Sequence, residues 1–119
     1  MSAMQQPQSN YPERIALSTA EGVHLVAVAD IVRLEADKNY TTFFFENQPN
    51  IIISKSLKEA EQLLDPDRFF RVHQSHTVCL RKITRFQRGP GGMLRMRNGD
   101  EIPVSRYKKE ALLERIASP

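Results

Sequence analysis

Residues 69–83 read FFRVHQSHTVCLRKI, and this stretch indicates how the second half of the chain folds. Its β-branched residues Val72, Thr77 and Val78 favour extended backbone, because branching at Cβ suits a pleated strand better than a helix. Strand signals continue through ITRF, and the turn sequence GPGG follows at residues 89–92. We therefore expect extended structure through this stretch, in a domain that is mostly β.

The same stretch contains two histidines and the only cysteine of the chain, at the spacing H-x-x-H-x-x-C. A zinc site needs three or four converging ligands, and a catalytic thiolate needs a base within hydrogen-bond reach. In one extended segment side chains alternate between faces, so His73 and His76 point apart, as do His76 and Cys79. We expect no metal site, no catalytic residue and no cofactor, and we interpret His73 as a hydrogen-bonded, partly buried histidine.

Strand patterns also dominate the rest of the chain. The apolar residues between Arg14 and Ala36 recur with a period of two, as in strands with one buried face. The runs YTTFFF and NIII are aromatic and β-branched, and the ENQPN segment between them is typical of a hairpin connection. Asn98-Gly99 is a strong signal for a tight hairpin turn. The chain is expected to contain roughly eight or more short strands.

Two segments change to the helical period. In SLKEAEQLL, Ser56 and Glu59 form the pattern of a capping box, and the apolar residues recur at helical spacing. This segment predicts a short helix inserted between strands. The second segment runs from Ser105 to Ile116, with Ser105 as the expected N-cap of a C-terminal helix.

Length and composition indicate one domain without a membrane segment. A chain of 119 residues can bury a single core, and we assign the domain to residues 14–117. Residues 1–13 are polar and are expected to form a flexible arm or the remnant of a linker. No apolar run approaches the ~20 residues of a membrane helix, and the polar N-terminus does not resemble a signal peptide. We expect a cytoplasmic protein with no membrane association.

The charges of the chain are unevenly distributed. Lys and Arg number 5 against 10 Asp and Glu in residues 1–67, but 12 against 4 in residues 68–119. Residues 68–99 contain eight cations and no acidic residue, which favours a polyanionic partner. A solvated basic face is the alternative that charge alone leaves open.

Three further cations, Arg106, Lys108 and Lys109, fall in the expected first turn of the C-terminal helix. Backbone N–H groups already make this end of a helix positive, so each cation there costs a few tenths to about 1 kcal/mol. An arrangement that opposes local stability suggests a bound anion, unless the three side chains simply extend into solvent. The planar fork of Arg106 suits a phosphate or the edge of a guanine.

Four segments occur together in a specific order: IVRLEADKNYTTFFF, SKSLKEAEQLL, DRFFRVHQSHTVCLRKI and GDEIPVSRYKKEALLERI. Their most specific parts are IPVSR and FFRVHQS, which is close to the pattern F-x-R-x-H-x-S. This combination, over residues 14–117, resembles the LytTR DNA-binding domain of bacterial transcription regulators. The resemblance implies a mostly β fold with an elongated arrangement of small antiparallel sheets. It also implies that loops, and not a recognition helix, enter the major groove.

The resemblance further implies which residues contact DNA. Base-reading positions fall in the segment Asp37–Tyr40, at Cys79, where the family usually has asparagine, and at Arg106. An ordinary polar turn at Lys38-Asn39 and a buried Cys79 are the alternatives. The candidate DNA-binding residues are Lys38, Asn39, Tyr40, His76, Cys79, Arg81, Lys82, Arg106, Lys108 and Lys109.

The implied function is sequence-specific binding of double-stranded DNA in transcription regulation. Members of the family typically bind paired direct-repeat half-sites, one domain on each, which allows a homodimer on DNA. Many carry a receiver domain in a longer chain, as response regulators do. One alternative is an RNA-binding or single-strand-binding β domain, which would expose aromatic residues among its cations. A β-rich protein-interaction module is another.

Overall fold

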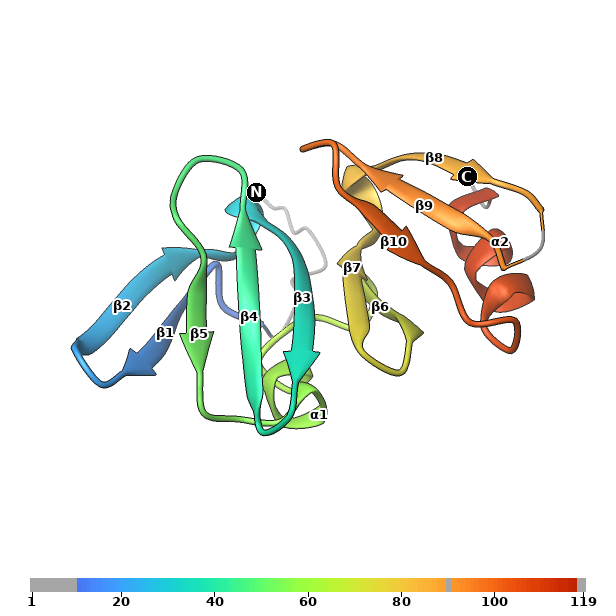
Figure 1. The fold of residues 1–119 in the computed structure, drawn as a ribbon. Coiled ribbons are helices and arrows are strands. Elements are labelled where there is room, and N and C mark those ends of the chain that lie inside the picture. Colours follow the sequence, from blue (N-terminus) through green and yellow to red (C-terminus); the bar gives the residue numbers. More distant parts are fainter. Residues whose placement is uncertain (1–10, 90, 118–119) are drawn as a thin grey trace, which may run out of the picture.

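Three antiparallel sheets form the framework of the structure, a computed structural model that describes residues 11–89 and 91–117 (Figure 1). The first sheet consists of β1 (Arg14–Thr19) and β2 (Gly22–Ala27). The second has the order β5-β4-β3-β7-β6 and contains β3 (Ile31–Asp37), β4 (Tyr40–Phe45), β5 (Ile51–Ile53), β6 (Phe69–His73) and β7 (His76–Cys79). The third has the order β10-β9-β8, with β8 (Ile83–Gln87), β9 (Met93–Met96) and β10 (Glu101–Pro103).

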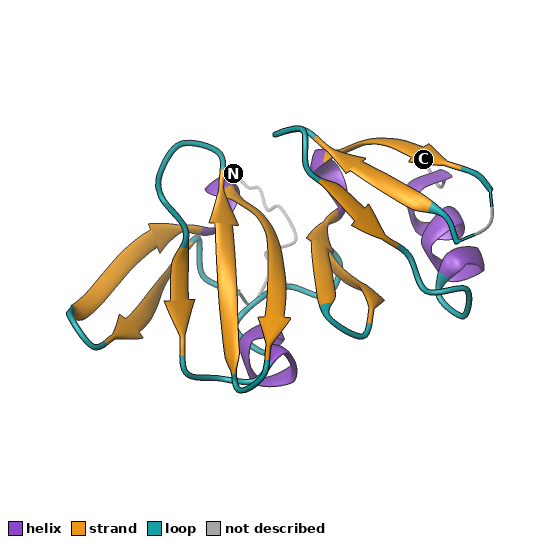
Figure 2. Cartoon of the chain, viewed as in Figure 1, coloured by secondary structure: helices purple, strands orange, loops and turns teal. Residues whose placement is uncertain are grey.

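Helices occupy a small share of the described residues (Figure 2). They are α1 (Leu57–Glu61), α2 (Lys109–Ala117) and the single 3-10 turns η1 (Val28–Asp30) and η2 (Leu80–Lys82). The predicted mostly β fold, with small antiparallel sheets, one inserted helix and a C-terminal helix, is confirmed. None of the described helices is both long enough and apolar enough to cross a bilayer. The arm expected over residues 1–13 falls largely outside the described residues.

The capping box predicted for α1 is present in full. The Ser56 hydroxyl accepts a hydrogen bond from the Glu59 backbone N–H at 3.1 Å, and the Ser56 N–H donates to the Glu59 carboxylate at 3.0 Å. Two free N–H groups at the helix start are thereby satisfied. Leu57 and Ala60 then face the core, with 4% and 0% of their surface exposed.

The opening stretch of the sequence forms a hairpin, which differs from our expectation of one extended segment. Strands β6 and β7 pair with each other, and the chain reverses at Gln74-Ser75. His73 and His76 are cross-strand partners whose ring centroids lie 5.2 Å apart. The expectation that they point apart is wrong because the alternation rule applies only within one strand. Among the described residues, no three His, Cys, Asp or Glu side chains are grouped closely enough to hold a metal ion.

The C-terminal helix begins at Lys109, three residues later than the start at Arg106 that an N-cap at Ser105 predicts. The hydroxyl of Ser105 accepts a hydrogen bond from the backbone N–H of Tyr107 at 3.3 Å, and its carbonyl accepts one from Lys108 at 2.9 Å. These are bonds of a turn that precedes the helix. Ser105 is therefore not the N-cap, and Arg106 belongs to the turn before α2 and not to its first helical turn.

Buried apolar residues form two cores, and the five-stranded sheet contributes to both. The first core joins this sheet to β1, β2 and α1, and includes Phe43 and Leu57. The second joins it to the third sheet and α2, and includes Val78, Leu94 and Leu112, each 0% exposed. Burial of each such side chain is worth about 1.5–3 kcal/mol. The second core therefore fixes the third sheet and α2 against the β6–β7 hairpin.

Candidate nucleic-acid interface

Three turns from different parts of the sequence reach the same edge of the molecule, the lower edge in Figure 1. They are the β3–β4 turn at residues 38–39, the β6–β7 turn at residues 74–75, and the turn at residues 105–108 that precedes α2. We call this edge the three-turn surface.

Main-chain hydrogen bonds fix the positions of the segments that carry these turns. The backbone N–H of Ala36, near the end of β3, donates to the carbonyl of Ser75 at 2.9 Å. The N–H of Ser105 donates to the carbonyl of Val72 in β6 at 2.8 Å. The β6–β7 hairpin is thus bonded to the segments that carry both other turns, and its residues Val72 and Val78 belong to the second core. A surface held in this way is ordered before any partner binds.

The β3–β4 turn presents a lysine and an asparagine at its tip. Asp37 pairs with Tyr40, so Lys38 and Asn39 alone connect the strands. Lys38 has a φ of 57°, in the left-handed region that favours glycine, which costs a non-glycine residue on the order of 1 kcal/mol. Lys38 and Asn39 are exposed, and half of the Tyr40 surface is exposed. The turn therefore offers a cation, an amide and a phenol to a partner.

The β6–β7 turn presents Gln74, which our sequence analysis did not select. Its side chain is exposed, while its carbonyl accepts a hydrogen bond from the Arg71 guanidinium at 3.2 Å. The ring Nδ1 of His73 accepts from the backbone N–H of Ser75 at 3.0 Å, as expected for a hydrogen-bonded, partly buried histidine. Recognising the Gln-Ser pair as a turn between two strands would have identified Gln74.

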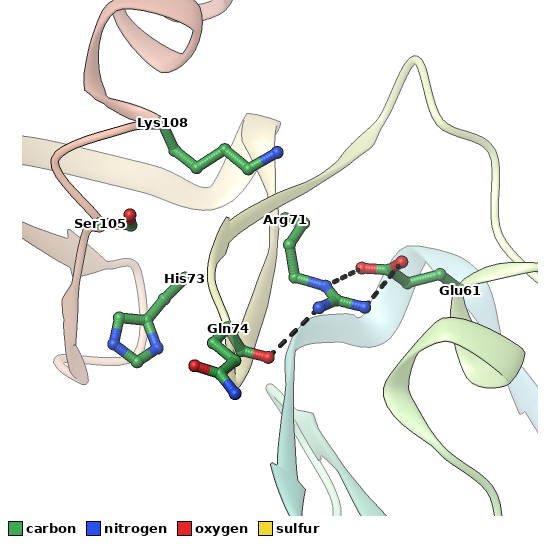
Figure 3. A pocket seen from close by; sticks show the side chains of 6 residues that line it. All are labelled: Glu61, Arg71, His73, Gln74, Ser105 and Lys108. Carbon is green, nitrogen blue, oxygen red and sulfur yellow. Dashed lines mark hydrogen bonds and ion pairs between the residues drawn. The ribbon is translucent and has the colours of Figure 1, made fainter.

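Arg71 supports the β6–β7 turn, and its charge is compensated by Glu61. Its guanidinium makes a two-pronged contact with the Glu61 carboxylate, at 2.7 and 3.3 Å (Figure 3). The hydroxyl of Thr77 donates to the same carboxylate. Because Arg71 also holds the Gln74 carbonyl, helix α1 is linked through Glu61 to the tip of the β6–β7 hairpin.

The turn before α2 adds two exposed cations and an exposed tyrosine to the surface. Arg106 and Lys108 are exposed, and Tyr107 is 86% exposed. Between this turn and the β6–β7 turn lies a hollow of about 340 Å³, whose walls include Gln74, Ser105 and Lys108 (Figure 3). Lys109, at the start of α2, is only partly exposed.

Two of the candidate residues are buried, contrary to our expectation. Cys79 is 7% exposed and belongs to the first core, so it does not stand at a groove-facing end of its strand. Lys82 is 6% exposed: its ammonium donates to the carbonyl of Ala29 and lies 3.6 Å from the Glu46 carboxylate. That carboxylate also binds Arg97 at 3.0 Å. Lys82 therefore joins the sheets and is not displayed to phosphates.

Arg81 is exposed, but it lies far from the three-turn surface. It belongs to η2, which follows the upper end of β7, whereas the β6–β7 turn lies at the lower end (Figure 1). Arg81 is therefore not part of the three-turn surface, and its assignment as a DNA-binding residue stays a prediction. The sequence shows only that a cation follows a strand, and the direction of the strand decides on which edge it falls.

His76 lies beneath the β6–β7 turn, with 15% of its side chain exposed. Its ring Nδ1 is buried without a hydrogen bond and lies 3.9 Å from the Glu35 carboxylate. Burial lowers the pKa of His76 below its ordinary value, because desolvation of the charged ring outweighs the attraction of Glu35. His76 is therefore held mainly neutral against the His73 ring, and its position suits support of the turn.

Arg33 connects the five-stranded sheet to the third sheet near this network. Its guanidinium lies 3.6 Å from the centre of the Phe44 ring and donates to Glu35 and to Asp100, each at 2.8 Å. Burial alone would raise the pKa of Asp100, but hydrogen bonds from Arg33 and Asn98 outweigh it and hold that pKa below its usual value. The ion pair thus anchors the β9–β10 turn.

The arrangement of exposed turns on a β framework can now be compared with known proteins. Residues 21–117 match the family model of the LytTr DNA-binding domain. The chain belongs to the LytTr family. Its structure is similar to the LytTr DNA-binding domain of a methyl-accepting/DNA response regulator from Bacillus cereus, with a TM-score of 0.76 and 27% identity. That alignment covers 88% of this chain and 97% of the other.

Two curated relatives of this LytTr domain are regulators. The chain is 36% identical over 103 residues to the CO-responsive transcriptional regulator RcoM of Rhodospirillum rubrum, which covers 81% of the chain and 42% of that protein. It is 29% identical over 100 residues to a response regulatory protein of Vibrio cholerae, of which it covers 38%. The chain thus spans well under half the length of these relatives, and it is a DNA-binding domain of transcription regulation.

Proposed function

We propose that this LytTr domain binds double-stranded DNA in a sequence-specific manner by placing its three turns against the major groove. The observation that carries the proposal is the three-turn surface, where exposed Lys38, Gln74 and Arg106 lie at the tips of separate elements along one edge. The major groove is about 12 Å wide and admits a two-stranded ribbon. The β3–β4 and β6–β7 hairpins are such ribbons, and each ends in a two-residue turn.

Each turn carries a group with suitable chemistry for base edges. Arg106 suits the O6 and N7 atoms of guanine, and the amides of Gln74 and Asn39 suit the N6 and N7 atoms of adenine. A good two-pronged contact of this kind discriminates against a wrong base by about 1–3 kcal/mol.

Other groups of the surface suit the DNA backbone. Lys38, Lys108 and Lys109 carry point charges that suit phosphates, and the Tyr40 hydroxyl can donate to a phosphate or sugar oxygen. Such contacts fix the orientation of the domain on the duplex and make its affinity depend on salt.

The two rival functions lack a comparable surface. A single-strand or RNA binder would stack bases on exposed aromatics, but Phe43 and Phe45 are 0% and 6% exposed, and Phe44 is covered by Arg33. The exposed Tyr40 and Tyr107 belong to different segments, the start of β4 and the turn before α2. A protein-interaction module would not require cations and amides at three turns along one edge. The proposed role is recognition, without catalysis.

The wider assembly forms part of the same proposal. We propose that two copies of the domain occupy paired direct-repeat half-sites, as a homodimer on DNA, and that a receiver domain belongs to a longer cytoplasmic chain. The response regulatory relative and the limited coverage of both relatives support a multidomain regulator.

The proposal is tested by selecting bound duplexes from a random pool and titrating the chain with the selected and a scrambled duplex. Arg106→Ala and Gln74→Ala should each reduce the ratio of the two affinities by about 5- to 150-fold. Lys108→Ala should weaken both duplexes about equally, and Lys58→Ala, an exposed control on α1, should change neither. Tighter binding to single strands, or an unchanged ratio in both base-contact variants, would refute the proposal.

A further inference from the structure

A second hollow lies at the end of the molecule opposite the three-turn surface. It has a volume of about 670 Å³ and is bounded by η2, β8 and the end of α2. In Figure 1, η2 stands at the upper end of β7, whereas the β6–β7 turn is at the lower end. DNA binding by the turns does not use this hollow, which we call the distal groove.

The rim of the distal groove carries arginines without acidic partners. Arg81 and Arg85 are both exposed, and neither forms a salt bridge within the described part of the chain. Arg85 also stands directly across from Arg95 in the β8–β9 ladder, and like charges in that position are destabilising. Arg95 is paired with Glu101 at 2.8 Å, which offsets this repulsion, so the cations available to an anion are the guanidinium groups of Arg81 and Arg85.

A third arginine is fixed at the wall of the groove. Arg115 donates from Nη2 to the carbonyls of Pro66 and Asp67, both at 3.0 Å, and lies over the Phe70 ring. Its position is therefore set before any ligand arrives. The Asp67 carboxylate is the only acidic group among the described residues that line the groove, so the lining retains a net positive charge.

Polar groups make up the larger part of the distal groove's lining, and a smaller apolar area lies among them. Leu80, Ile83, Phe86 and Ile116 are partly buried against the second core, and their remaining surface faces the groove. Arginines that only face solvent would not need partly buried apolar residues beside them. The groove falls in the size range of ligand sites, about 300–1,000 Å³, and it offers both charged groups and an apolar area.

We propose that the distal groove binds a small organic anion with an apolar body, such as an aromatic or alkyl carboxylate. The carboxylate would lie between Arg81 and Arg85, whose forks match its two oxygens. The body would cover Phe86 and Ile83 and lose its contact with water. This site goes beyond DNA recognition and does not depend on it.

The test is a titration of the ¹⁵N-labelled full chain followed by amide chemical shifts. Three probes separate the contributions: naphthalene-2-carboxylate has charge and body, naphthalene-2-methanol has the body alone, and inorganic phosphate has charge alone. The carboxylate should shift amides of residues 80–86 and 115–117 in a saturable manner. The alcohol should bind at least about tenfold more weakly, because a charge-assisted hydrogen bond is lost. Phosphate should not saturate the site.

Variants make the assignment specific. Arg81→Gln combined with Arg85→Gln should abolish saturation by the carboxylate, whereas Lys55→Gln combined with Lys58→Gln should leave it unchanged. The control pair removes the same charge from exposed positions near α1. A selected duplex should not displace the carboxylate. Shifts confined to the three turns, equal binding of the alcohol, displacement by the duplex, or no saturation would each overturn the proposal.

Discussion

Replacing Lys82 by methionine separates a structural role from a DNA-contacting role. Methionine retains an apolar stem of similar length but removes the ammonium, which donates to the Ala29 carbonyl and pairs with Glu46. Glu46 keeps Arg97 at 3.0 Å, so the substitution leaves no unpaired carboxylate. The main loss is a hydrogen bond from a charged donor, worth about 1.5–3 kcal/mol.

A loss of about 2 kcal/mol should lower the melting temperature of a chain of this size by about 10 °C. Differential scanning calorimetry measures this shift. Fluorescence anisotropy at several salt concentrations then measures how the logarithm of the DNA affinity depends on the logarithm of salt. Because Lys82 is buried, that slope should not change at a temperature where both proteins are folded.

The matched control is Arg81→Met, which removes one cation from the neighbouring exposed position. It should change the stability by no more than about 0.5 kcal/mol, as surface substitutions usually do. The reasoning is refuted if Lys82→Met melts like the wild type and its salt slope is smaller by about 0.9, the value for one lost phosphate contact.

Three further predictions concern residues of the core and of the turns. Cys79→Asn should lower the free energy of unfolding by about 1–3 kcal/mol in denaturant titrations, since it buries an amide in the first core, and a variant of unchanged stability with altered base preference would contradict this. His76 has a lowered pKa, so the unfolded state binds its proton more readily. The free energy of unfolding should therefore be highest above pH 6.5, the ordinary pKa of histidine, and should decline as the pH falls below it. Melts of His76→Gln should show a smaller decline. Lys38→Gly should raise stability by about 0.5 kcal/mol, since glycine tolerates the φ of 57° but loses more chain entropy on folding, and should weaken DNA binding. Calorimetry measures the stability of Lys38→Gly and fluorescence anisotropy its DNA affinity. A lower stability or an unchanged affinity would contradict this prediction.

Features that depend on neighbours along the chain could be predicted from the sequence. The capping box joins Ser56 to Glu59 over three positions, and the two-residue turn at Lys38-Asn39 lies between two strongly patterned strands. Local backbone preferences and short hydrogen bonds decide such features, so no knowledge of the fold is needed. The mostly β class was accessible in the same way, whereas the sequence pattern predicts the turn that contains Arg106 as the first turn of the C-terminal helix.

The hairpin at Gln74-Ser75 was missed because its local signal is weak. Neither residue is a glycine or a proline, and the β-branched residues on both sides favour one continuous strand. The turn is held by contacts from elsewhere, namely the Ser75 carbonyl with Ala36 and the Arg71 guanidinium with Glu61. These contacts also bring His73 and His76 together.

The class of fold, the capped helix and a polyanionic partner could be predicted from the sequence alone. Periodicity, helix caps and clusters of cations all depend on residues that are close in the sequence. Which of the cations are exposed and which are buried depends on the tertiary structure. Lys82 is withdrawn by a hydrogen bond to Ala29, 53 positions away, while Cys79 is enclosed by the first core. Burial depends on which distant segments pack together, and that packing cannot be inferred from the sequence of one chain.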